Sequence, residues 1–180
     1  MSEEKTRLLI LLRDRSVKRG DFVLASGRRS DLYVDVRQTS LHAEGGLRIG
    51  QLMARQLRAD VVAVGGMTLG ADPVVTATSV VSALNGRPLH AFIIRKEAKE
   101  HGAKDLVVGR SNLNPGDKVA IVEDTTTTGG SLLKAVERAR EIGLDVVQCI
   151  TVVDREEGAR DFLAGHGLML ESLVTRAELL

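Results

Sequence analysis

The sequence is poor in several residue types that mark specialised classes of protein. Only 2% of its 180 residues are aromatic, it has no tryptophan, and its one cysteine is Cys149. A single cysteine excludes an internal disulfide and suits a reducing compartment, so we expect a cytoplasmic protein. The scarcity of aromatic rings argues against a nucleic-acid binder that stacks bases on its side chains.

Charge and hydropathy exclude two further kinds of partner. The formal net charge is +1 at pH 7, which gives no basic footprint for DNA or RNA. No apolar run approaches the length that spans a bilayer. The start of the chain, Ser2-Glu3-Glu4, is acidic where a signal peptide is basic. We therefore expect neither nucleic acid nor a membrane as a partner.

What remains is the composition of an ordinary globular domain, 43% apolar and 27% charged. The length suffices for one well-packed domain and is short for two. We find no internal repeat, linker or low-complexity tract. The sequence therefore predicts a single domain over residues 1–180, with an N-terminal annex at 1–40 and a core at 41–180.

One stretch, residues 118–131, carries the strongest functional signal. Residues 119–122 are apolar and rich in β-branched side chains, which predicts a strand buried on both faces. Two acids follow directly, Glu123 and Asp124, and then four threonines, two glycines and Ser131. Leu132 and later apolar residues recur at helical spacing. The pattern is therefore strand, polar loop, helix.

This arrangement fits a ligand that carries a phosphate beside a sugar. Ligands bind at the carboxyl ends of parallel strands, and a loop rich in Gly, Thr and Ser that enters a helix offers donors to an anion. Carboxylates accept hydrogen bonds well from a ribose diol. The stretch lacks the lysine of a P-loop and contains no G-x-G-x-x-G. The alternative is a helix capped by Thr or Ser with solvated acids before it, although four threonines exceed what a cap needs.

The rest of the chain alternates strands with helices, which predicts an α/β fold with a parallel sheet and right-handed crossovers. An amphipathic helix over 3–18 ends near Gly20, and Asp72 is the expected N-cap of a later helix. Thr175 and Glu178 form a capping box. The expected strands are 22–25, 32–36, 60–66, 90–94, 119–122, 145–153 and 168–174, and the other helices are 44–57, 72–84, 132–142 and 158–164.

Residues 95–104 form the most cationic segment. Arg95, Lys96, Lys99, His101 and Lys104 oppose two acids, Glu97 and Glu100. The segment has almost no apolar anchor, so it cannot bury itself. A cationic lid over a diphosphate leaving group would have this composition. A solvated charged hairpin is the alternative.

These motifs resemble those of type I phosphoribosyltransferases. Residues 119–131 are similar to their phosphoribosyl pyrophosphate (PRPP) motif, an apolar strand with two acids, a short loop and T-G-G-S/T. Residues 95–102, 22–35, 70–73 and 153–158 are similar to motifs of one member family, orotate phosphoribosyltransferase. The match covers nearly the whole chain. It implies a central, mainly parallel sheet flanked by helices, with an N-terminal helix and hairpin as a hood.

The resemblance also implies a reaction and roles for individual residues. The phosphoribosyl group of PRPP passes to orotate, giving orotidine 5′-phosphate and diphosphate in pyrimidine biosynthesis. Asp124 and Lys99 act in catalysis, Glu123 and Asp124 hold the ribose hydroxyls, and Arg155 pairs with the orotate carboxylate. The 5′-phosphate is wrapped by Thr125, Thr126, Thr127, Thr128, Gly129, Gly130 and Ser131, with Thr127 also near orotate, and the diphosphate is contacted by Arg95, Lys96, Lys99 and His101.

Two further expectations come from the same resemblance. Mg²⁺ is bound mainly through PRPP and diphosphate, with no metal site made by protein side chains. The residue matching Lys99 acts in the neighbouring subunit, which implies a homodimer with shared sites. Ala25 stands where some relatives carry a lysine, and Leu69-Gly70 stand where some carry a Tyr-Lys pair; both departures concern the diphosphate side.

Three alternatives stay open from the residues. Arg155 alone, within Asp-Arg-Glu-Glu, is more typical of a surface ion pair. A purine phosphoribosyltransferase would keep residues 119–131 but would have no use for a carboxylate-binding arginine. A non-catalytic PRPP-binding regulator would keep the phosphate loop and lose the cations of the lid.

Overall fold

The computed structural model describes residues 2–23, 29–97 and 106–180, without the side chains of 23 and 29–31. A six-stranded sheet of order β5-β4-β3-β6-β7-β8 forms its centre, and β1 and β2 form a separate hairpin. The strands are β1 Val17–Val23, β2 Arg29–Val34, β3 Ala63–Met67, β4 His90–Ile94, β5 Val107–Val108, β6 Lys118–Thr126, β7 Asp145–Asp154 and β8 Leu170–Thr175. The helices are α1 Glu3–Arg15, α2 Arg37–Ser40, α3 Ala43–Gln56, α4 Ala71–Leu84, α5 Gly130–Glu141, α6 Ala159–Ala164 and α7 Arg176–Leu179, with a 3₁₀ turn η1 at Arg110–Asn112.

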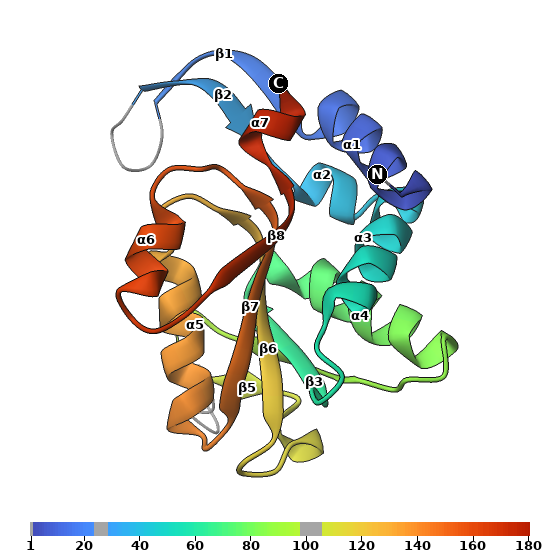
Figure 1. Cartoon of the computed structure of the whole chain (residues 1–180), viewed down its shortest axis with the longest axis vertical. Helices are drawn as coiled ribbons and strands as arrows, with labels where there is room; N and C mark the ends of the chain where they lie inside the picture. Colours follow the sequence, from blue (N-terminus) through green and yellow to red (C-terminus); the bar gives the residue numbers. More distant parts are fainter. Residues whose placement is uncertain (1, 24–28, 98–105) are drawn as a thin grey trace.

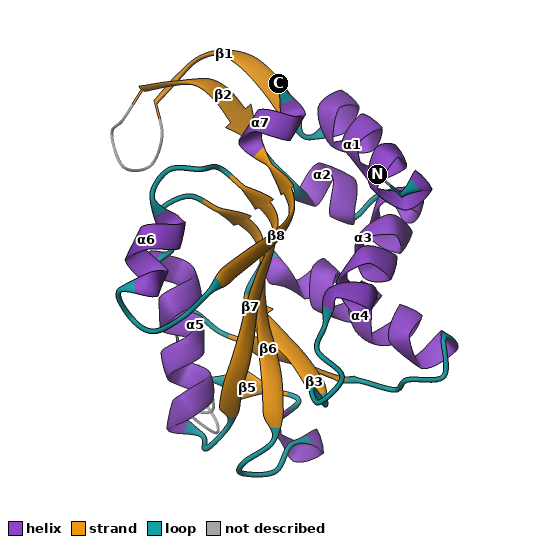
Figure 2. Cartoon of the chain, viewed as in Figure 1, coloured by secondary structure: helices purple, strands orange, loops and turns teal. Residues whose placement is uncertain are grey.

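The sheet is parallel except for β5, which pairs antiparallel with β4. Helices α1, α3 and α4 lie on one side of it and α5 and α6 on the other (Figures 1 and 2). This is the predicted α/β architecture with a mainly parallel sheet, and the prediction is confirmed.

The position of β6 inside the sheet explains why its apolar run is continuous. Ala120 and Val122 pack in the core with α1, α3 and α4. Val119 and Ile121 point the other way and pack with α5 and α6. Because successive side chains of a strand alternate between faces, a strand covered on both sides must be apolar at every position.

The N-terminal region departs from the sequence prediction. Helix α1 ends at Arg15 rather than at residue 18, and Gly20 lies inside β1 instead of closing the helix. The expected strand 22–25 therefore begins earlier, at Val17, which pairs with Val34 of β2. Pairing with β2 outweighs the helical spacing of this β-branched residue.

The start of α4 also differs from the prediction. Its N-cap is Gly70, and Asp72 and Pro73 are the second and third helical residues. Proline is tolerated there because N–H groups of the first turn have no intrahelical acceptor. Helix α2 follows β2 and was not predicted, whereas the strand at 90–94 and the capping box of α7 are confirmed.

In the part of the chain that the structure describes, no helix combines the length and apolar composition needed to cross a bilayer.

Candidate active site

The end of β6 places the two adjacent acids beside an open edge. Strand β3 pairs with β6 only as far as Ile121, whereas β7 continues alongside to Thr126. The loop after β3 therefore lies next to Glu123 and Asp124 instead of a further stretch of strand. The carboxyl ends of parallel strands and their loops form the usual binding edge of such a sheet.

A pocket of about 390 Å³ opens at this edge. Its walls come from the end of β2 and the start of α2, the loop after β3, the residue after Arg95, the end of β6 and the first turn of α5. The lining residues are Val34, Asp35, Arg37, Met67, Thr68, Leu69, Gly70, Lys96, Glu123, Asp124, Thr125 and Ser131. Sequence segments from five parts of the chain thus meet at the predicted acids.

Burial raises the pKa of both acids. For Glu123 the raising effect of burial is opposed by hydrogen bonds from the hydroxyls of Ser131 and Thr126, the latter at 3.0 Å. For Asp124 it is opposed by the backbone N–H of Thr125 at 2.8 Å and by the charge of Arg37. The pocket thus contains two adjacent carboxyl groups that can accept hydrogen bonds from the hydroxyl groups of a ligand.

Gly70 allows the loop after β3 to lie against Asp124. A Cβ built at this position would overlap Asp124 Oδ1. Any other residue would force the carboxylate or the loop to move. Thr125 Oγ1 is buried and has no hydrogen-bond partner among the described residues, so one wall of the pocket holds a polar atom that a ligand would satisfy.

The loop from Thr127 to Gly129 leads into α5. Its N-cap is Gly129, in the left-handed region at φ 87°, and no side chain caps the helix. A Thr or Ser cap, the alternative considered for this loop, is therefore wrong. Thr127 is half-buried and Thr128 and Ser131 are exposed. The uncapped N–H groups at the start of α5 favour an anion, in keeping with the predicted phosphate loop.

The cations of the predicted lid are placed only in part. Arg95 is half-buried and Lys96 is exposed, and both line a neighbouring hollow of about 620 Å³ against the face of α5. Lys96 also lines the pocket of the acids, so it links the two spaces. Lys99 and His101 lie outside the described residues, and so does Ala25.

Arg155 is buried rather than exposed. It follows the end of β7, its backbone N–H donates to Thr126 O at 2.9 Å, and its side chain is 3% exposed. The guanidinium donates to Leu32 O at 3.0 Å and pairs with Glu157 at 3.0 Å. A surface ion pair, the alternative considered for this residue, is therefore wrong. Arg155 lies under the hairpin of β1 and β2 and is not among the residues that line the 390 Å³ pocket.

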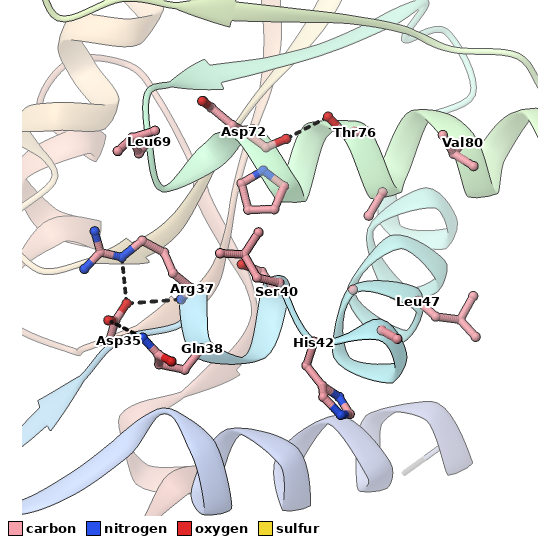
Figure 3. A pocket seen from close by; sticks show the side chains of 15 residues that line it. Asp35, Arg37, Gln38, Ser40, His42, Leu47, Leu69, Asp72, Thr76 and Val80 are labelled. Carbon is pink, nitrogen blue, oxygen red and sulfur yellow. Dashed lines mark hydrogen bonds and ion pairs between the residues drawn. The ribbon is translucent and has the colours of Figure 1, made fainter.

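Sequence reasoning missed Arg37 as a site residue. It begins α2, and its Nε donates to Asp35 Oδ1 at 2.7 Å while the backbone N–H donates to the same oxygen (Figure 3). Arg37 lowers the pKa of Asp35, with help from Gln38. An Asp-x-Arg pair directly after a strand was the available signal. The sequence predicts a strand over 32–36 and assigns no chemistry to the residues at its end.

Known proteins match this chain over nearly its full length. Residues 43–164 match the phosphoribosyl transferase domain family. An orotate phosphoribosyltransferase of Nostoc sp. is 47% identical, covering 99% of this chain and 86% of that protein. The crystal structure of Mycobacterium tuberculosis orotate phosphoribosyltransferase with Fe(III) dicitrate has a TM-score of 0.85 at 42% identity, covering 98% of both chains. Its complex with PRPP has a TM-score of 0.81 at 40% identity, again covering 98% of each.

Proposed function

Because the chain belongs to the phosphoribosyl transferase family, and within it to the orotate phosphoribosyltransferases, we propose that the pocket at the end of β6 is its active site. The protein is an enzyme of pyrimidine biosynthesis that transfers the 5-phosphoribosyl group of PRPP to orotate and releases diphosphate. The observation that carries the proposal is the meeting of the acid pair with an uncapped α5 N-terminus in one pocket.

The acids would bind the ribose. Glu123 and Asp124 are adjacent near the end of β6, and their carboxylates can accept hydrogen bonds from the 2′- and 3′-hydroxyls of ribose. As the diphosphate leaves, positive charge develops on the ribose ring. The carboxylate of Asp124 would stabilise that charge in a site partly shielded from water.

The loop from Thr125 to Ser131 would bind the 5′-phosphate. Its threonine hydroxyls and the N–H groups at the start of α5 supply donors, and the positive end of the helix dipole favours the anion. The phosphate and the acids would fix the sugar at two points. This leaves the anomeric carbon facing the loop after β3 and the start of α2, which form the opposite wall.

Cations would stabilise the leaving diphosphate. Arg95 and Lys96 line the hollow beside the pocket, Lys96 also lines the pocket itself, and Lys99 and His101 follow them in the sequence. Bound Mg²⁺ would supply further neutralisation of the diphosphate charge. No group of three His, Cys, Asp or Glu side chains among the described residues is arranged to hold a metal. Following the family, we assign Mg²⁺ mainly to oxygens of PRPP and diphosphate, since this ion is commonly bound through substrate phosphates.

Arg155 would recognise the orotate carboxylate. A buried arginine at the end of β7, next to the end of β6, is a suitable partner for a planar carboxylate. Its ion pair with Glu157 and its bond to Leu32 O hold the guanidinium beneath the hairpin. The hairpin would then act as a hood over the base, with residues 1–40 and 41–180 as parts of one domain. The core supports this unity, since Leu8, Leu12 and Leu32 pack with the sheet.

We also propose that the enzyme is a homodimer. A groove of about 970 Å³ runs between α2, α3 and α4 and is largely apolar (Figure 3). Leu41, Leu47, Leu69 and Val80 line it and are 45–75% exposed, an unusual concentration of apolar surface. Asp35, Arg37 and Leu69 line both this groove and the active-site pocket. A second copy seated here would contribute directly to the site.

The dimer proposal has a direct test in solution. We expect Leu47→Glu with Val80→Glu to shift the protein to a monomer in light scattering after size exclusion. Met169, which is 80% exposed and not among the residues that line this groove, provides the matched control as Met169→Glu. A double variant that stays dimeric would contradict the use of this groove.

A cytoplasmic location also remains a prediction, and the buried free thiol of Cys149 agrees with it.

An assay of base choice tests the proposed active site and its substrate together. The purified protein is given PRPP and Mg²⁺ with orotate, uracil, adenine or xanthine, and diphosphate release is measured. We expect turnover with orotate alone. Turnover with adenine or xanthine would indicate a purine enzyme, and PRPP binding without turnover would indicate a regulator.

A further inference from the structure

Arg37 is held in a fixed orientation by its own neighbours. The Asp35 carboxylate accepts from Arg37 Nε at 2.7 Å and from its backbone N–H at 3.2 Å, and it also accepts from Gln38 Nε2 at 3.3 Å. Asp35 is 16% exposed, whereas the Arg37 side chain is 46% exposed. The carboxylate is thus an inner anchor, and the guanidinium is the part that faces the open space.

The outer edge of the guanidinium is available for a ligand. No hydrogen bond from either Nη group to another described residue is present, and Figure 3 shows the guanidinium joined to Asp35 through Nε. An arginine presents parallel N–H donors that match two oxygens of one phosphate group. Fixing Nε on Asp35 leaves the Nη donors to meet such an anion with little further loss of conformational freedom.

The position of Arg37 in the pocket decides which part of the substrate it meets. In the pocket, Glu123 and Asp124 lie between the phosphate loop and the opposite wall, which is formed by the loop after β3 and the start of α2. A ribose bound with its phosphate at α5 and its diol at Glu123 and Asp124 has its anomeric carbon toward that far wall. Arg37 lies on this wall, on the side of the acids where the diphosphate is attached.

The loop after β3 provides no cation of its own at this wall. Gly70 has no room for a side chain because Asp124 fills the place of its Cβ. Leu69 is apolar and 70% exposed. Among the residues that line the pocket, the cations are Arg37 and Lys96. The pocket also contains the carboxylates of Asp35, Glu123 and Asp124, so a diphosphate there needs more positive charge than one lysine supplies.

We propose that Arg37 binds the diphosphate group of PRPP through its Nη donors, and that Asp35 is the positioning residue that orients it. The inference rests on the proposed function, since it takes the ribose orientation from it. Arg155, the other anion-binding candidate, lies beneath the hairpin, does not line this pocket and is assigned above to the orotate carboxylate. The two arginines thereby divide the two anions on the anomeric side, with Arg37 on diphosphate and Arg155 on orotate.

Calorimetric titration of the intact enzyme separates diphosphate contacts from the others. Inorganic diphosphate with Mg²⁺, ribose 5-phosphate and orotate are titrated into the wild type and Arg37→Gln. We expect the variant to bind diphosphate about tenfold more weakly or worse, because a charge-assisted contact is lost, while ribose 5-phosphate binding stays within about twofold. In steady-state assays the KM for PRPP should rise and the KM for orotate should stay unchanged.

Two companion variants make the result specific. Arg55→Gln also removes an arginine paired with a carboxylate, Glu4, but on the surface of α3, and it should leave every affinity unchanged. Asp35→Asn keeps Arg37 and loosens its anchor, so we expect a smaller loss of diphosphate affinity, about threefold, with unchanged ribose 5-phosphate binding. Circular dichroism melts confirm that each variant is folded.

Each contrary result has a distinct meaning. Diphosphate affinity equal to wild type in Arg37→Gln would overturn the inference while leaving the proposed function standing. Weaker binding of orotate, with diphosphate unaffected, would reassign Arg37 to the base and would equally overturn it. A wild-type protein without orotate-dependent turnover would instead reject the proposed function.

Discussion

At the scale of single residues, the proposed site contains two carboxylates, Glu123 and Asp124, whose burial disfavours their charged form. Burial raises the pKa of Glu123 and Asp124, so the folded state binds protons that the unfolded chain releases. For acids with raised pKa values, stability falls as pH rises from the unfolded pKa through the folded pKa. At neutral pH both carboxylates are therefore held at the expense of stability, as expected for residues kept for binding and catalysis.

Asp124→Asn should separate these two contributions. The amide keeps an acceptor for the Thr125 N–H and removes the charge. We expect kcat to fall on the order of ten- to a thousandfold, because one electrostatic contact to developing charge is lost. The Tm at pH 7 should rise by about 1–2 °C, a gain that shrinks at pH 4 where the wild-type carboxyl is closer to neutral. Unchanged kcat would contradict the catalytic role of Asp124. A lower Tm would contradict the argument that its buried charge destabilises the folded protein at pH 7.

Arg155→Ala should affect the base rather than the sugar. If the guanidinium receives the orotate carboxylate, the KM for orotate rises while the KM for PRPP is nearly unchanged. The side chain also bridges Leu32 O and Glu157, so the variant will lose some stability and is assayed well below its own Tm. Arg155→Lys serves as the control because it keeps the charge and loses the paired donors. Equal damage to both KM values would mean that the residue is structural.

At the scale of elements, the sequence predicted what depends on local pattern and missed what depends on tertiary pairing. The strands at 119–122 and 90–94 follow from their short, continuous apolar runs alone. The sequence predicts Val17 within the first helix and Gly20 at its end, because the pairing of β1 with β2 has no signal within one element. The acids and the phosphate loop were found because they are contiguous. Arg37 was missed because its relevance depends on the distant loop at Gly70 and on Asp124.

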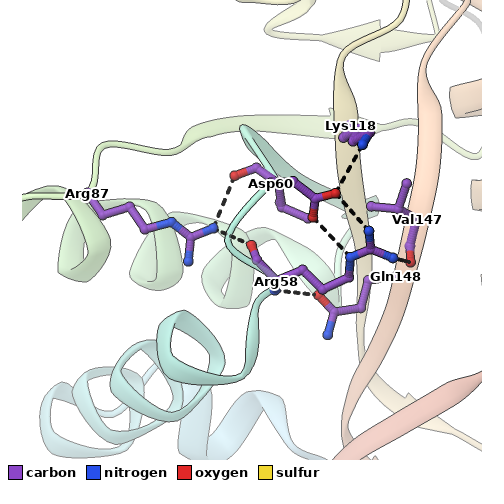
Figure 4. A network of polar contacts seen from close by, with 7 residues as sticks. Arg58, Asp60, Arg87, Lys118, Val147 and Gln148 are labelled. Atoms are coloured by element: carbon purple, nitrogen blue, oxygen red, sulfur yellow. Dashed lines mark hydrogen bonds and ion pairs between the residues drawn. The ribbon is translucent and has the colours of Figure 1, made fainter.

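The connection between α3 and β3 shows another contact that local pattern does not predict. Arg87, which follows α4, donates to the carbonyl oxygen of Arg58 (Figure 4) and to those of Leu57 and Val61. Nearby, Asp60 pairs with Arg58 at 2.7 Å and Lys118 at 3.1 Å, but these pairs are exposed and contribute little. Arg87 thus satisfies backbone acceptors that no strand or helix reaches.

Arg87→Ala should accordingly destabilise the fold without affecting the site. Three carbonyl oxygens lose a charged donor, so we expect a loss of about 1–3 kcal/mol and a Tm lower by roughly 3–8 °C in a thermal melt. Arg138→Ala is the comparison, since it removes an exposed ion pair with Glu141 and should shift the Tm by less than about 2 °C. A Tm for Arg87→Ala within that margin would show that water replaces the arginine adequately.

At the scale of the whole molecule, the groove and the active site are continuous. Asp35, Arg37 and Leu69 line both, so a partner bound in the groove would border the pocket. The hairpin, the loop after β3 and the end of β6 supply three sides of the pocket from one chain. In a two-fold dimer each protomer would offer its neighbour the same surface and receive the same contribution in return. Shared sites would then follow from where the groove lies.

Hybrid dimers test whether Lys99 acts across that interface. Lys99→Ala and Asp124→Asn should each retain little activity alone. After the two variants are mixed and reassociated, half of the dimers contain one of each. If Lys99 serves the partner's site, one site of each hybrid collects both defects and the other collects none, so activity recovers to roughly a quarter of wild type. If Lys99 serves its own subunit, every site carries one defect and no activity returns. Native mass spectrometry establishes that hybrids have formed, which makes an absence of recovery decisive against a lid that works in the partner.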